Sequence, residues 1–197
     1  GANKAAIMGV AGVSTADVVL IQSQTAASDA SVSFTSGITS TYDEYIFKFY
    51  NINPDSETSD ALLTFQCDLA GGDNGYNDLD IVSNFFRAYH NEADDGEGLT
   101  YQGDFDLHSI SSFQTLTRDA GAGADESCAG ELHLFNPAST TYIKPFTSRF
   151  VTNTKDNACH NSFSGGFFLS TSAINAIQFK MSNGSSFDGK IKMWGVK

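Results

Sequence analysis

The sequence has few basic residues: 11 Lys and Arg stand against 23 Asp and Glu among 197 residues, which gives a net charge of −12. A surface of this sign repels phosphate backbones and anionic lipid headgroups, so we expect neither nucleic acid nor a membrane as a partner. Residues 43–131 hold 19 acids and 3 bases, whereas residues 144–197 hold 7 bases and 2 acids. Either the two segments form faces of opposite sign that orient contacts with a neighbour, or the acids lie on loops and keep the protein in solution.

Long apolar runs and helical patterns are also missing. No run approaches the roughly 18 apolar residues of a membrane-spanning helix, and residues 1–8 lack the charged and apolar regions of a secretory signal. We therefore expect no membrane insertion and no export by a recognisable signal. No stretch sustains an apolar helical period over three turns, although a short turn at 170–175 is compatible with the sequence.

Cysteine is scarce, and its spacing excludes two kinds of site. The three cysteines, Cys67, Cys128 and Cys159, are too far apart for a zinc site and too few for a disulfide framework. Cys67 lies in a predicted strand and is expected to be a small buried hydrophobe. Cys128 and Cys159 lie in polar segments and could pair with each other. The odd number leaves at least one free thiol, which fits assembly in a reducing cytoplasm.

Signatures of catalysis are absent or weak. The four histidines show no ligand spacing, glycine-rich phosphate loops are missing, and the nearest approach to a nucleophile elbow, residues 162–166, lacks its first glycine. Glycosidase carboxylates face each other across a cleft from rigid elements, whereas acids in one flexible run repel one another. We expect no enzyme and no cofactor, and a glycan-cleaving enzyme is the third alternative. Its candidate acids within residues 91–98 are Glu92, Asp94, Asp95 and Glu97.

Short aromatic and β-branched runs, each closed by Gly, Asn, Asp or Ser, fill the chain from residue 31 to its end. Such runs predict half-buried strands. We expect one all-β domain over residues 31–197, a jelly-roll-like sandwich of two antiparallel sheets with about ten strands. The predicted strands cover residues 31–35, 45–52, 61–67, 83–90, 112–117, 130–136, 144–152, 162–170, 173–181 and 189–196.

Alternation within two of these strands predicts which side chains face the core. In the second strand the inward face holds Tyr45, Phe47 and Phe49. In the last strand, Ile191 and Met193 point inward and Trp194 points outward. The single tryptophan is then either a shielded sheet residue or part of an interface or ligand platform.

Residues 1–30 differ from the rest, because small residues dominate and aromatic residues are absent. This segment is either an N-terminal arm or the first strand of the sandwich. Residues 18–21 are apolar enough to form an edge strand, and such an edge is normally covered by its own sheet or by a neighbouring subunit.

Aromatic residues near predicted loops are candidates for ligand binding. Exposed rings stack on the apolar faces of sugars, and carboxylates such as Asp94 and Asp95 accept hydrogen bonds from sugar hydroxyls. The same rings could instead close the ends of the sandwich. The candidate aromatic residues are Tyr76, Tyr89, Tyr101 and Phe105.

The acid-rich loop at 68–80 offers oxygen ligands of the kind that Ca²⁺ prefers, but it lacks the residue offsets of an EF-hand. A solvated turn is the first interpretation of this loop and calcium is the alternative. No other metal is expected.

Five segments resemble sequences of virion structural proteins of marine tailed bacteriophages, and they are spread over the domain, which extends the resemblance over roughly residues 20–197. The segments are 33–47, 86–94, 132–137, 172–180 and 189–195. The resemblance implies a noncatalytic particle component with a jelly-roll-like sandwich that forms a homo-oligomer. It supplies no catalytic residues, and the three cysteines depart from the family's pattern.

Within a virion, two roles follow from this resemblance. The first is a receptor-binding tip of a tail fibre or spike, which attaches to a host surface glycan through its loops. The alternative is a capsid decoration or head-fibre protein that docks on the capsid lattice through residues 1–30. Other virion proteins are the expected partners, a trimer is the favoured oligomer, and the expected location is the virion, assembled in the host cytoplasm.

Overall fold

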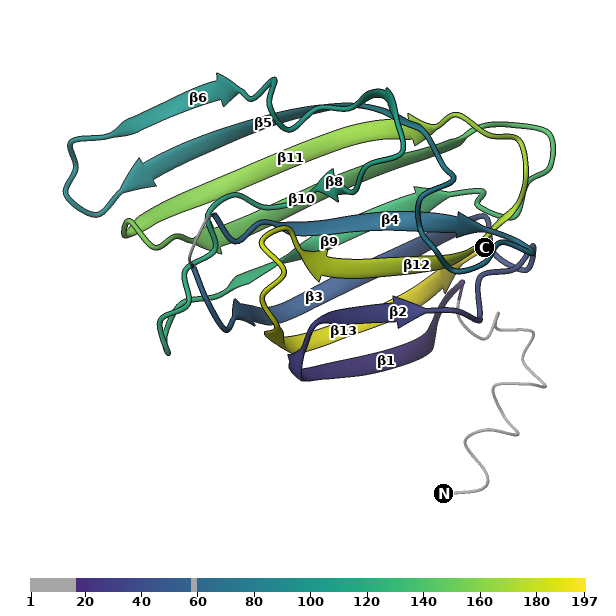
Figure 1. Cartoon of the computed structure of the whole chain (residues 1–197), viewed down its shortest axis with the longest axis horizontal. Coiled ribbons are helices and arrows are strands. Elements are labelled where there is room, and N and C mark those ends of the chain that lie inside the picture. Colours follow the sequence, from purple (N-terminus) through teal and green to yellow (C-terminus); the bar gives the residue numbers. More distant parts are fainter. Residues whose placement is uncertain (1–16, 58–59) are drawn as a thin grey trace.

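The computed structural model describes residues 17–57 and 60–197, which form 13 β-strands (Figure 1). No helix occurs among these residues, so none of sufficient length to cross a bilayer is found in them. The strands are β1 Val18–Asp29, β2 Ser31–Phe34, β3 Glu44–Pro54, β4 Leu63–Leu69, β5 Ile81–Asn91, β6 Glu97–Tyr101, β7 His108–Ile110, β8 Gln114–Thr115, β9 Cys128–Phe135, β10 Lys144–Asn153, β11 Ala158–Phe168, β12 Ile174–Met181 and β13 Phe187–Val196.

The strands form two antiparallel sheets of unequal size. The large sheet has nine strands in the order β1-β13-β3-β9-β10-β11-β5-β6, with β7 also paired to β5, and the small sheet has the order β2-β12-β4-β8. The prediction of an all-β sandwich is therefore confirmed. Each of the ten predicted strands overlaps an observed one, and the structure adds β1, β6 and β7.

The core lies between the small sheet and the part of the large sheet behind it (Figure 1). Tyr45, Phe47 and Phe49 are buried, as alternation along β3 predicts. The ring of Phe179, from β12 in the opposite sheet, lies 5.5 Å from that of Phe47 and 4.9 Å from that of Phe49. Buried rings in edge-to-face contact add to the hydrophobic stabilisation, so this aromatic cluster joins the two sheets.

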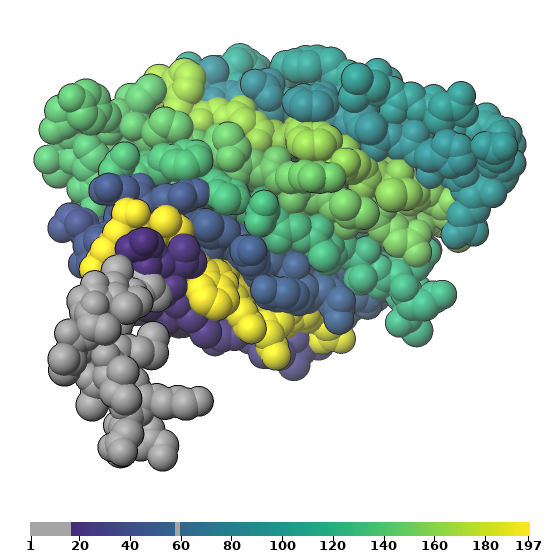
Figure 2. Space-filling view, turned by 180° about the vertical axis from the view of Figure 1, so that it is seen from behind, coloured from purple at the N-terminus to yellow at the C-terminus, as the bar shows by residue number. Residues whose placement is uncertain are grey.

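The inward and outward sides of β13 also follow the predicted alternation. Ile191 and Met193 are fully buried, and Trp194 lies on the opposite side, partly shielded. Figure 2 shows the molecule from behind, with the outer face of the large sheet toward the viewer.

Residues 18–29, which the sequence assigns either to an arm or to the first strand, form β1 at one edge of the large sheet. β1 pairs with β13, and the Gln24 side-chain amide donates to the Ser33 carbonyl of β2 at 2.6 Å. β1 therefore joins the edges of the two sheets. Residues 1–16 of the predicted arm lie outside the described residues.

All three cysteines are free. Cys67 is buried in β4, as predicted, and Cys128 is buried in β9, whereas Cys159 is exposed on β11. β10 lies between β9 and β11, and the two side chains point to opposite faces of the sheet. The pairing of Cys128 with Cys159 that the sequence allowed is therefore not formed.

The small sheet covers only part of the large sheet. In Figure 1 the strands β11, β5 and β6 extend past the edge of the small sheet. Their inner faces carry polar side chains, among them Ser164, whose hydroxyl lies 2.6 Å from that of Ser148 on β10. We call β11, β5 and β6 the extended half of the large sheet, and β13, β3 and β9 the covered half.

Candidate functional site

The outer face of the extended half carries a row of aromatic side chains. Phe163 of β11 lies opposite Phe86 of β5, which in turn lies opposite Tyr101 of β6. The rings of Phe86 and Phe163 stack with centroids 5.0 Å apart, and the Arg149 guanidinium lies 5.5 Å from the Phe163 ring. Phe86 is 38% exposed, Tyr101 is 61% exposed and Leu99 is 74% exposed. These strands therefore present an aromatic surface to solvent.

The ring of Tyr101 is held by its hydroxyl. This hydroxyl donates to the Asp106 carboxylate at 2.5 Å, and the hydrogen bond raises the pKa of Tyr101 above its usual value. The phenol is therefore neutral at physiological pH, and its ring has a fixed direction on the outer face. An exposed ring that is already ordered loses little conformational entropy when a ligand packs on it.

The turn between β5 and β6 is closed by its own polar side chains. The Asn91 side-chain oxygen accepts hydrogen bonds from the Asp95 and Gly96 N–H groups, and its NH₂ donates to the Asp95 carboxylate at 2.6 Å. His90 Nε2 lies 3.1 Å from a carboxylate oxygen of Asp94, whose side chain is 88% exposed. The hairpin is thus an ordered acidic turn that presents carboxylate oxygens to water.

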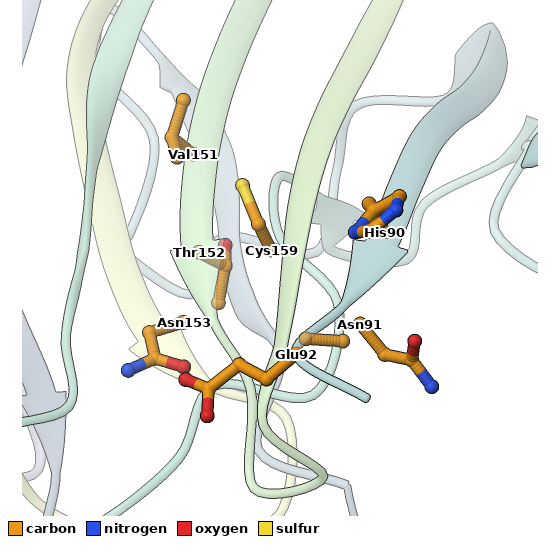
Figure 3. Close-up of a pocket in the computed structure, with 8 residues that line it drawn as sticks. His90, Asn91, Glu92, Val151, Thr152, Asn153 and Cys159 are labelled. Atoms are coloured by element: carbon orange, nitrogen blue, oxygen red, sulfur yellow. The ribbon is translucent and has the colours of Figure 1, made fainter. Parts of the chain in front are cut away.

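A pocket of about 330 Å³ lies beside this turn, where β5, β10 and β11 end (Figure 3). We call it the hairpin pocket. Cys159 is the register partner of both His90 on β5 and Asn153 on β10. The pocket combines an apolar wall at Val151 with polar groups at its rim, including Glu92. A pocket with one apolar wall and a few polar groups suits a small polar ligand.

The structure separates the predicted tyrosines. Tyr101 and the acids Asp94 and Asp95 lie at the outer face and its adjoining turn, whereas Tyr89 points to the inner face of β5. There Tyr89 is half-buried, and the Arg87 guanidinium lies 4.7 Å from its ring centroid. Tyr89 and Tyr101 therefore do not share one binding surface.

The other two predicted aromatic residues belong to the interior or its margin. Tyr76 is 4% exposed, and burial raises the pKa of its hydroxyl, so it offers no free ring face to a ligand. Phe105 packs edge-on against Phe85 with centroids 5.4 Å apart, and Arg118 lies over the Phe105 ring. These two rings therefore pack against other parts of the protein and do not belong to the aromatic row of the outer face.

Two carboxylates of the acidic loop at 68–80 accept backbone hydrogen bonds within the loop, although Asp68 Oδ2 is buried without a partner among the described residues. Asp68 is buried and accepts a hydrogen bond from the Leu69 N–H, and Asp73 accepts one from the Gly75 N–H. Within residues 17–57 and 60–197, no group of three or more His, Cys, Asp or Glu side chains is placed to hold a metal ion. Calcium binding by this loop stays a prediction.

The polar interior of the extended half was not predicted from the sequence. Arg87 Nη1 lies 2.7 Å and 2.9 Å from the two ring nitrogens of His160 and donates to the unprotonated one. Burial, followed by the positive charges of Arg87 and Arg118, lowers the pKa of His160 to about 4. The neutral imidazole is thus the form that Arg87 can bond. Only the alternation of His160 with Ser162 and Ser164 could have indicated a polar strand face.

Comparison of the chain with protein-family models, with curated proteins and with solved structures finds no match.

Proposed function

We propose that this protein is a noncatalytic structural component of a bacteriophage particle, and that it attaches to a host surface glycan through the outer face of its extended half. The segments that resemble virion proteins support the setting. The observation that supports attachment is the exposed Tyr101 ring, which stands in an aromatic row four residues along β6 from the acidic turn.

This combination has the chemistry that sugars require. The C–H face of a pyranose packs on an aromatic ring, and its hydroxyls donate to carboxylate oxygens. Tyr101 supplies an ordered ring, and Asp94, on the turn at the other end of β6, supplies exposed oxygens to a further unit of the same glycan. The hairpin pocket gives a second contact to a glycan of more than one unit.

The alternative is a capsid decoration or head-fibre protein. The observation that favours it is the edge strand β1, which exposes Val18 and Leu20 directly after residues 1–16. An exposed apolar edge is suited to pairing with another subunit. In either role the protein is a homo-oligomer among other virion proteins, and a trimer is favoured.

The attachment role is tested with purified protein and with particles. The Tyr101→Ala variant should bind host envelope glycans at least about tenfold more weakly, because a central aromatic anchor carries much of the binding energy. The matched control is Tyr142→Ala, since Tyr142 is 72% exposed and lies outside the aromatic row. Equal binding by both variants would contradict the role of the outer face.

Immunogold labelling of intact particles separates the two positions. Label at the tail agrees with attachment, whereas label over the head, with unchanged host adsorption of Tyr101→Ala particles, assigns the protein to decoration. Cleavage of a glycan by the purified protein, measured as released sugar, would contradict the noncatalytic proposal. To assign this cleavage to the protein, the four acids of residues 91–98 are replaced by amides, and the release of sugar must then disappear.

A further inference from the structure

A β-bulge in β3 changes the side-chain pattern of the outer face. Residues 44–49 alternate regularly, but Tyr50 and Asn51 are both exposed in succession. Asn51 has a left-handed φ of +49°, and the register of β3 shifts there against both of its neighbours. A bulge of this kind redirects side chains and commonly accompanies functional sites.

The bulge opens a hollow of about 390 Å³, which lies in the covered half, away from the acidic turn. We call it the bulge hollow. Thr25, Lys190 and Tyr50 lie directly opposite one another on β1, β13 and β3. Gly189 has φ +137°, and a Cβ atom there would lie 2.6 Å from Ile52 Cδ1, so only glycine fits beneath the bulge. The hollow is lined by Thr25, Tyr50, Asn51, Gly189, Lys190 and Lys192.

The two lysines of the hollow make no ion pair with any carboxylate of residues 17–57 and 60–197. The Lys192 ammonium lies 5.4 Å from the Tyr50 ring centroid. The acid next to the hollow in sequence, Asp188, accepts a hydrogen bond from the Ser28 N–H at 2.8 Å. In a protein of net charge −12, two ammonium groups without carboxylate partners form a local site of positive potential.

Other acids lie nearby but face a different space. Asp125 and Glu126 line a separate hollow on the far side of Asn51. Glu126 there accepts a hydrogen bond from the Gly123 N–H at 2.6 Å. Lys48, in the next row of the sheet, is 3.7 Å from Glu131. An anion is therefore attracted to Lys190 and Lys192 and repelled by the neighbouring hollow.

We propose that the bulge hollow binds an acidic monosaccharide unit, a pyranose that carries a carboxylate or a sulfate. The lysines pair with the anionic group, Tyr50 offers an aromatic surface to the sugar ring, and Thr25 and Asn51 bond its hydroxyls. A bare inorganic anion would use the lysines but neither the ring nor most of the volume.

This inference deepens the proposed function, on which it rests for its biological setting, because it names the class of glycan. The acidic sugar unit would bind at β1, β13 and β3, whereas the acidic turn joins β5 and β6 near the opposite edge of the sheet. The carboxylates of that turn would repel the same anion. A polymer with neutral and acidic units could contact both places on one face.

The test uses ligand-observed NMR on the full chain at low ionic strength, because salt screens exposed charges. The probes are methyl glucuronide, methyl glucoside and methyl glucoside 6-sulfate, and inorganic sulfate, which has no protons to observe, is tested as a competitor of methyl glucuronide. We expect the two acidic sugars to bind and the neutral sugar and inorganic sulfate to bind at least about tenfold more weakly. The relative affinity of glucuronide and sulfated glucoside then identifies the anionic group.

Three variants locate the binding. Lys190→Gln/Lys192→Gln and Tyr50→Ala should each weaken methyl glucuronide binding at least about tenfold, whereas the control Lys180→Gln, on β12 of the small sheet, should leave it unchanged. Urea unfolding of each variant verifies that the domain is intact. Unaltered binding in Lys190→Gln/Lys192→Gln, or equal binding of glucoside and glucuronide, would overturn the proposal.

Two further outcomes separate this inference from the proposed function. If no acidic sugar binds but Tyr101→Ala still loses host adsorption, the bulge hollow fails and attachment stands. If acidic sugars bind and Tyr101→Ala particles adsorb normally, the hollow stands and attachment through the extended half fails.

A concentration-dependent oligomer that dissociates in Lys190→Gln/Lys192→Gln, without sugar binding, would assign the lysines to a contact between copies and overturn the proposal.

Discussion

The covered and extended halves of the large sheet use the same strand geometry with different interiors. In the covered half, the inward side chains are apolar and meet the small sheet, as Phe47 and Phe49 do at Phe179. In the extended half, the inward side chains are mixed, because Phe85 and Phe168 are buried there together with the polar residues His160, Ser162 and Ser164. Strand pairing alone therefore does not require an apolar face. The apolar face occurs where a second sheet is available to pack on it.

The two halves also differ in how well their buried groups are satisfied. The phenylalanine rings of the covered half need no hydrogen-bond partners, and the buried Tyr45 hydroxyl donates to the Thr39 carbonyl. Trp194 Nε1 is the one buried polar side-chain atom on β13, β3 and β9 without a partner among the described residues. In the extended half and on the adjoining β10, Ser162 Oγ and Thr152 Oγ1 are buried without a partner among the described residues. A buried polar atom that lacks a partner costs free energy. We expect the extended half to open locally before the covered half, since its interior gains less from burial.

The largest expected effect is in the covered half. Phe179→Ala removes the ring that packs on Phe47, Phe49 and two further phenylalanines, and it should lower the free energy of unfolding by about 3 to 5 kcal/mol. The control is Phe163→Ala on the outer face of the extended half, which should cost about 1 kcal/mol. Urea denaturation measures both. Equal losses of unfolding free energy in the two variants would show that packing against the small sheet does not make the covered half more stable than the extended half.

The second expected effect is a pH dependence in the extended half. His160 has a pKa of about 4 when folded, against about 6.5 when unfolded, so the unfolded chain binds more protons between these values. The contribution of the neutral His160 to the free energy of unfolding is complete above about pH 6.5 and is lost as the pH falls toward 4. Between pH 7 and pH 5 the loss should be about 2 kcal/mol.

The control for this effect is His160→Asn, which removes the titrating group and leaves the carboxylates unchanged. The difference in unfolding free energy between wild type and variant should shrink as the pH falls from 7 to 5. Parallel pH profiles of the two proteins would mean that the Arg87–His160 contact does not hold the imidazole neutral.

The contrast between the halves also explains what the sequence could predict. In β3, strict alternation of aromatic residues identified the core face of Tyr45, Phe47 and Phe49 correctly. In β11, the inward residues His160, Ser162 and Ser164 are polar, so the same rule gave no core face there and the predicted strand began four residues late, at 162. β6 was missed because its sequence is largely polar and it pairs on one edge only.

The candidate sites show the same limit. Tyr101 and Tyr89 were grouped as binding residues, but their opposite faces depend on the registers of β5 and β6, which composition does not reveal. The bulge hollow depends on one extra residue at Asn51, and although asparagine tolerates a left-handed φ, its presence does not determine how the register of β3 shifts against its neighbours. Local alternation is encoded in neighbouring residues, whereas a site built from three strands is encoded only in their pairing.

The smallest effect on stability, and a direct probe of both faces, is thiol labelling. In native protein, iodoacetamide should modify Cys159 alone, because it is exposed on the outer face of the extended half. Cys128 lies in the covered half, where burial raises its pKa to about 12, and burial also raises the pKa of Cys67. These two thiols should react more than about a thousandfold more slowly, through unfolding. Mass spectrometry of native and urea-unfolded samples counts the labels.

Cys159→Ser separates the possible outcomes, since it should leave no fast label in native protein and two labels after unfolding. Fast labelling of Cys128 would show that the covered half opens as readily as the extended half, which would remove the contrast in interior packing. Protection of wild-type Cys159 that is lost on dilution would show that a second copy covers the hairpin pocket. In that case the outer face is an interface within the oligomer, and a glycan could reach it only at the subunits left uncovered.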